Sequence, residues 1–155
     1  MTAQVWIAIL VGLAATIDDL ARRRIANWIP LAALAGGFSW QIGRHGWMGG
    51  GYALAGAAAG FAVFLIFYLL GGMGGGDIKL MAGFGALLGL QGVLWAALLT
   101  AIVGGLLALG VIAFKSARRA LRGGNEVKNQ GEQKEAIPYA PAITLGVWLS
   151  LVPKG

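Results

Sequence analysis

Long apolar runs recur along the chain, and short polar or glycine-rich breaks separate them. A helix needs about 20 residues to cross the hydrocarbon core of a membrane, and apolar runs approaching that length are typical of transmembrane helices. The pattern predicts six spans, at residues 4–17, 26–42, 49–70, 78–90, 92–114 and 137–152. We therefore expect an all-α polytopic membrane protein, with residues 1–155 forming a single transmembrane domain.

The composition supports a membrane protein and excludes several kinds of site. Hydrophobic residues make up 58% of the chain and charged residues 12%, whereas about 25% of the residues of soluble domains are charged. With no cysteine and a single histidine, His45, the chain has no disulfides, thiol nucleophile, Cys-ligated zinc or His-rich metal site. We expect no cofactor, no metal and no nucleic-acid partner. Most of the 27 glycines are expected to let helices pack closely in lipid.

The basic residues predict the orientation of the spans. The first apolar run lacks a preceding Lys or Arg, so we interpret it as a retained helix and not as a signal peptide. On the six-span scheme, 10 of the 12 Lys and Arg residues fall on one side of the membrane. Positively charged loops face the cytoplasm, which puts both termini outside and makes residues 115–136 a cytoplasmic loop. The basic start of that loop is expected to contact anionic lipid headgroups.

All six acidic residues fall on the same side as most of the basic ones. The three glutamates belong to the polar loop and are expected to be solvated, whereas Asp18, Asp19 and Asp77 lie at the ends of predicted spans one and four. Ionisable groups are costly there and usually functional. Two carboxylates held together cannot easily both ionise, so one can take a proton from water while the other donates to a peptide carbonyl. The alternative for Asp77 is ordinary capping of a helix start.

Three segments resemble the type IV prepilin peptidases, a family of aspartic membrane peptidases with a GxGD signature. They are "DLARRRIANW" after span one, "GGGDIKLMAGFGALLG" entering span four and "IPYAPAITLG" in span six. Their order and places match the short members of the family that serve Flp/Tad-type pili, and the resemblance covers nearly the whole chain. Gly74, Gly76 and Asp77 match the signature, and Lys79 matches the lysine that usually follows it.

The resemblance implies that Asp19 and Asp77 are the catalytic pair. In the family, the first aspartate opens a segment that usually ends in Arg-Arg-Ile-Pro-Asn, and counting back along this chain selects Asp19 over Asp18. Ala26 stands where the proline is usual. Asp18 is instead expected to pair with Arg22, four residues further along the helix.

The remaining motif residues each have two interpretations. Lys79 either biases the protonation of the pair or marks the cytoplasmic boundary. Pro138, Tyr139 and Pro141 either hold the backbone open on the substrate side of the site or form an ordinary turn at the start of span six. Asn27 is expected to cap span two.

The function that the resemblance implies is removal of a short basic leader from prepilins or pseudopilins. The enzyme would be an aspartic endopeptidase of the bacterial inner membrane, acting at the cytoplasmic face, with the prepilin substrate and membrane lipids as partners. Because the chain starts at span one and lacks cysteine, we expect no methyltransferase activity and no requirement for S-adenosylmethionine or zinc.

Two other functions stay open on the residues alone. One is an intramembrane protease of the presenilin or signal-peptide-peptidase type, although three arginines flank the first aspartate here and favour cleavage at the membrane surface. The other is a small transporter or an assembly subunit, in which the aspartates bind a cation or pair with basic residues.

Overall fold

The computed structural model describes residues 2–70, 73–121 and 139–152. The described residues form helices and their connections, with no β-strand among them. The helices are α1 (Ala3–Arg22), α2 (Trp28–His45), α3 (Trp47–Leu69), α4 (Gly75–Leu121) and α5 (Ala140–Ser150). The all-α prediction is confirmed. Three described helices are long and apolar enough to cross a membrane, namely α1, α3 and the Gly75–Phe114 part of α4, and α5 is a shorter apolar helix.

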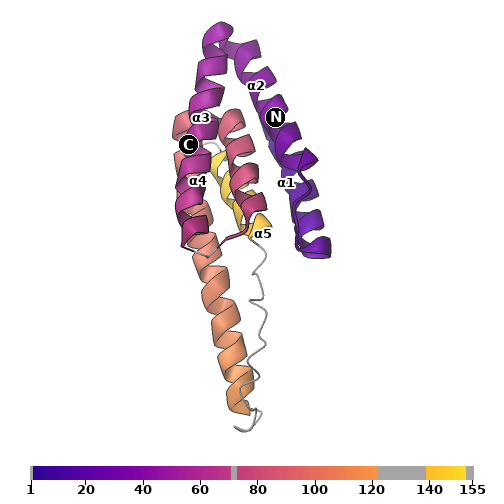
Figure 1. Cartoon of the computed structure of the whole chain (residues 1–155), viewed down its shortest axis with the longest axis vertical. Coiled ribbons are helices and arrows are strands. Elements are labelled where there is room, and N and C mark those ends of the chain that lie inside the picture. The colour runs from indigo at the N-terminus through magenta and orange to yellow at the C-terminus, as the bar shows by residue number, and fades with distance from the viewer. Residues whose placement is uncertain (1, 71–72, 122–138, 153–155) are drawn as a thin grey trace.

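Helix α4 is broken at Gly89, where the backbone leaves the helical conformation at φ 72° and ψ 178°. Its first part, residues 75–88, and its second part, residues 90–121, run in opposite directions (Figure 1). This break lies beside the boundary that the sequence predicts between the fourth and fifth spans. The number of membrane crossings and the outward position of the termini stay predictions.

Two glutamine side chains stabilise the broken end of the first part of α4. A helix end leaves carbonyl groups without intrahelical partners. Gln4 Nε2 donates to Leu87 O at 3.0 Å, and Gln41 Nε2 donates to the same oxygen at 3.4 Å. Helices α1 and α2 therefore both hold the chain just before its reversal at Gly89.

The expected cytoplasmic loop, residues 115–136, begins as helix. Helix α4 continues to Leu121, because this stretch is rich in Ala, Arg and Leu, which favour helix. Residues 122–136 of the expected loop lie outside the described residues.

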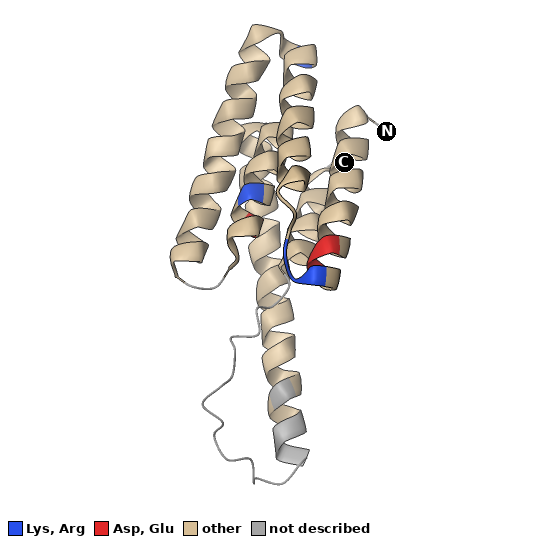
Figure 2. Ribbon diagram, turned by 45° about the vertical axis from the view of Figure 1, so that its right-hand side comes forward, with Lys and Arg blue, Asp and Glu red and all other residues tan. Residues whose placement is uncertain are grey.

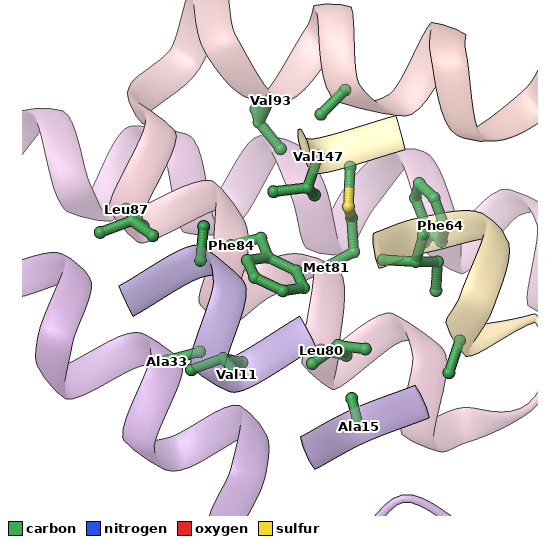
Figure 3. Close-up of a cluster of buried hydrophobic side chains, with 14 of the residues drawn as sticks. Val11, Ala15, Ala33, Phe64, Leu80, Met81, Phe84, Leu87, Val93 and Val147 are labelled. Carbon is green, nitrogen blue, oxygen red and sulfur yellow. The ribbon is translucent and has the colours of Figure 1, made fainter. Parts of the chain in front are cut away.

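The first part of α4 lies at the centre of the hydrophobic core. Figure 3 shows Leu80, Met81, Phe84 and Leu87 from this segment among apolar side chains from the surrounding helices, which include Val11, Ala15, Ala33, Phe64, Val93 and Val147. All of these side chains are buried. The start of this segment, which includes Asp77, is therefore enclosed by the surrounding helices.

Close contacts between glycines bring α3 against the first part of α4. A Cβ atom at Gly56 would overlap the backbone oxygen of Gly85, and a Cβ atom at Gly85 would overlap that of Gly56. This pair confirms the predicted packing role of glycine for these two helices.

We expect Gly56→Val to destabilise the protein, because the new side chain has no room against α4. Overpacking of this kind costs about 1–3 kcal/mol of unfolding free energy. Gly51→Val on the same helix is the matched control, since a Cβ atom there meets nothing within 4 Å. Thermal unfolding in detergent measures both variants, and equal stability of the two would contradict the packing role.

Candidate active site

Asp19 lies in the last turn of α1 and is buried, with 8% of its surface exposed. The helix ends just after it because Arg23 adopts a left-handed conformation with φ 52°, and the Arg23 N–H donates to Asp19 O at 2.8 Å. Figure 2 shows the acidic segments of α1 and of the start of α4 toward the same end of the bundle. The ends of two helices thus carry the predicted catalytic pair.

The side chain of Asp19 joins α1 to the start of α5. Its Oδ2 atom accepts a hydrogen bond from Ala140 N at 3.2 Å. Ala140 is the first residue of α5, so its N–H has no acceptor within that helix. One carboxylate oxygen of Asp19 is therefore oriented by a backbone group from a distant part of the chain.

Asp77 lies in the first turn of α4 and is also 8% exposed. Its Oδ2 atom accepts from Gly74 N at 3.2 Å, and Asp77 N donates to Gly74 O at 3.1 Å. This reciprocal pair resembles a capping box, so the capping interpretation of Asp77 holds for one of its oxygens. The other oxygen, Oδ1, is buried and has no hydrogen-bond partner within the described chain.

The two carboxylates lie close enough for the charge of Asp19 to act on Asp77. Both are largely removed from solvent, where such an interaction is only weakly screened. Two buried carboxyl groups whose charges interact cannot easily both ionise, which favours a state in which one of them is protonated. The described residues include no group of three or more His, Cys, Asp or Glu side chains that could hold a metal ion.

The glycines of the signature make room at this site. A Cβ atom at Gly76 would lie 3.2 Å from Ile25 Cβ, and one at Gly74 would lie 3.3 Å from Asp77 Oδ2. Both distances are tighter than ordinary contacts. The absence of a side chain at Gly76 lets the connection between α1 and α2 pack against the start of α4, and its absence at Gly74 leaves room for the Asp77 carboxylate.

The side chain of Asp18 makes different contacts from that of Asp19. Its Oδ1 atom forms an ion pair with Arg22 Nε at 3.5 Å, which confirms the predicted local pairing. Its Oδ2 atom also accepts from Ala26 N at 2.7 Å. Asp18 therefore holds the connection between α1 and α2.

Lys79 joins the start of α4 to the start of α2. Its Nζ atom donates to Asn27 Oδ1 at 3.1 Å, in an exposed contact. Asn27 does precede the first residue of α2, but its side chain makes no capping hydrogen bond. The expected side-chain cap is therefore wrong, because the amide oxygen accepts from Lys79 instead.

The third motif contributes a backbone group that sequence reasoning missed. Tyr139 is partly buried and directly precedes α5, and Pro141 lies in the first turn of that helix. Pro138 lies outside the described residues. Proline favours the first turn of a helix, so Pro141 was a signal that a free N–H lies nearby. The donor to Asp19 is that of Ala140.

The profile of the type IV leader peptidase family matches residues 6–109, which include both aspartates of the pair. The chain belongs to this family. A prepilin leader peptidase/N-methyltransferase of Aeromonas hydrophila is 30% identical over 146 residues, which cover 90% of this chain and 45% of that protein. One of Bacillus subtilis (strain 168) is 36% identical over 95 residues, covering 60% and 33%.

The chain spans less than half the length of these leader peptidase relatives. No solved structure matches it significantly.

Proposed function

We propose that the chain is a membrane aspartic endopeptidase that removes the leader from prepilins or pseudopilins. The observation that carries this proposal is the buried pair of Asp19 and Asp77 inside the region that matches the leader peptidase family. Each carboxylate has one oxygen held by a backbone N–H. Asp77 Oδ1 has no partner within the described chain, which leaves it available to a water molecule or a peptide.

The pair would cleave a peptide bond without a covalent intermediate. The ionised carboxylate takes a proton from water as the water oxygen attacks the carbonyl carbon, while the protonated carboxyl donates to the carbonyl oxygen. In the tetrahedral intermediate the C–N bond then breaks, and the leaving nitrogen takes a proton from the first carboxyl group. The second carboxylate regains its proton from the hydroxyl group, so the pair returns to its starting state.

Three motif residues near Asp77 support this chemistry through their contacts, namely Gly74, Gly76 and Lys79. Gly74 donates to Asp77 and Gly76 leaves space for the connection after α1. Lys79 holds Asn27 in that connection. In this scheme they align the two helix ends that carry the carboxylates, and Tyr139 and Pro141 place Ala140 against Asp19.

Cleavage would take place at the cytoplasmic face of the bacterial inner membrane. Both aspartates lie at helix ends, and Asp19 is followed closely by Arg22, Arg23 and Arg24. This position favours cleavage at the membrane surface over cleavage within a transmembrane segment. With the break at Gly89 dividing α4, six helical segments would cross the membrane and leave both termini outside.

The direct test uses membranes that contain the full chain and a prepilin with its leader attached. We expect release of the leader, detected by mass spectrometry, and none in membranes that lack the chain. Intact prepilin after incubation under both conditions would contradict the proposal.

A second experiment tests the orientation, since a cysteine-free chain gives no background in thiol labelling. The single substitutions His45→Cys and Ser116→Cys each place a thiol at an exposed position. In the predicted topology, residue 45 lies outside the membrane and residue 116 lies on the cytoplasmic side. In spheroplasts, a membrane-impermeant maleimide is expected to label the cysteine at 45 and to reach the one at 116 only after lysis. Labelling of both before lysis, or of 116 alone, would overturn the orientation.

A further inference from the structure

A pocket of about 200 Å³ lies between α3 and the second part of α4. Its walls include Phe64, Phe67, Met73, Thr100, Gly105 and Tyr139. The lining is mostly apolar. Gly105 is exposed, and a Cβ atom there meets nothing within 4 Å, so the pocket reaches the surface along the second part of α4.

Two residues of the pocket wall directly precede backbone groups of the candidate active site. Met73 directly precedes Gly74, whose N–H donates to Asp77 Oδ2. Tyr139 directly precedes Ala140, whose N–H donates to Asp19 Oδ2. Each of the two N–H groups that orient a carboxylate thus directly follows a residue that lines the pocket. The pocket therefore lies next to the two chain segments whose N–H groups orient the carboxylates.

The size and lining of the pocket suit one large apolar side chain. Apolar cavities of about 150 Å³ take up a molecule such as benzene, so this pocket has room for an aromatic or large aliphatic group. The aromatic rings of Phe64 and Phe67 offer broad contact surfaces. A charged or strongly polar group would find few partners there.

We propose that this pocket binds one large apolar side chain of the protein substrate, next to the bond that is cut. The inference rests on the proposed function, because it takes the occupant to be the chain held between Asp19 and Asp77. The pocket is then the part of the site that selects the substrate by side-chain size.

The test fills the pocket from Gly105 and compares substrates. Gly105→Leu adds a large side chain at the wall of the pocket. Gly110→Leu is the matched control, because Gly110 lies on the same helix, is not among the lining residues and also has open space at its Cβ position. The substrates are a prepilin that the wild-type chain cleaves, and versions in which the residues flanking the cut are replaced by alanine one at a time.

We expect Gly105→Leu to lower kcat/KM for the unaltered prepilin by about tenfold or more, as when a pocket loses the space for its side chain. The loss should shrink for one alanine version, whose smaller side chain fits the filled pocket. Gly110→Leu should cleave every substrate like the wild type.

The subsite and the peptidase function fail in different ways. If the wild-type chain releases no leader, the proposed function is overturned. If it does, and Gly105→Leu either matches it or loses activity equally on every substrate version, the subsite is overturned while the peptidase function stands. That pattern would assign the pocket to lipid or to helix packing.

Discussion

The Asp77→Asn variant is expected to release leader from a prepilin about 10²–10⁴-fold more slowly than the wild-type chain, the usual contribution of a general acid or base. Asparagine can still accept from Gly74 N as Asp77 Oδ2 does, so the start of α4 should stay intact. It cannot exchange a proton with water or with a carbonyl oxygen. Asp19→Asn should cause a loss of the same order, because either carboxyl alone lacks its partner. Leader release per amount of folded protein in membranes measures both.

Asp18→Asn is the matched control for this pair. It makes the same chemical change one residue away and can still accept from Ala26 N. The ion pair that it removes involves an exposed arginine and contributes less than about 1 kcal/mol. We expect near wild-type cleavage from this variant. Retained cleavage in both Asp19→Asn and Asp77→Asn would mean that the aspartates are structural or ion-binding groups, and the aspartic mechanism would be abandoned.

The Gly89→Val variant is expected to lose stability. The backbone at Gly89, with φ 72° and ψ 178°, lies in a region that is nearly exclusive to glycine, and forcing another residue there costs about 1–3 kcal/mol. A Cβ atom would also lie 3.3 Å from Gln41 Nε2, which donates to Leu87 O. Thermal unfolding in detergent and the amount of protein in membranes measure the effect.

Gly110→Val provides the comparison for Gly89→Val. Gly110 lies in the second part of α4 with open space at its Cβ position, and valine is slightly better than glycine in a helix. This variant should unfold at or slightly above the wild-type temperature. If Gly89→Val were equally stable, the reversal of α4 would not depend on the conformation of Gly89.

Much of the fold could be predicted because a helix that is surrounded by lipid has an apolar sequence. Apolar runs must form helices in lipid, since every backbone group needs an internal partner. The boundary expected at residues 90–92 therefore fell close to the break at Gly89. The ends of the helices were harder to predict, because polar residues such as those at 115–121 can continue a helix beyond the apolar run.

The residues of the candidate site could be named from the sequence, but most of their contacts could not. The pairing of Asp18 with Arg22 followed from helical spacing and is confirmed. The side-chain partner of Asn27 was expected within its own helix, yet it is Lys79 from α4. Such long-range contacts leave no periodic signal in the sequence.

By itself, the sequence determined that the chain is helical and apolar, that it belongs among the leader peptidases, and that its few aspartates lie at helix ends. These properties depend on local composition and short motifs. Only the tertiary structure decided that Ala140 N orients Asp19, and that one oxygen of Asp77 caps α4 while the other lacks a partner within the described residues. It also decided that Met73 and Tyr139, which precede the two N–H donors, line one pocket. These features depend on how α1, α4 and α5 pack together, and packing joins residues that are far apart along the chain.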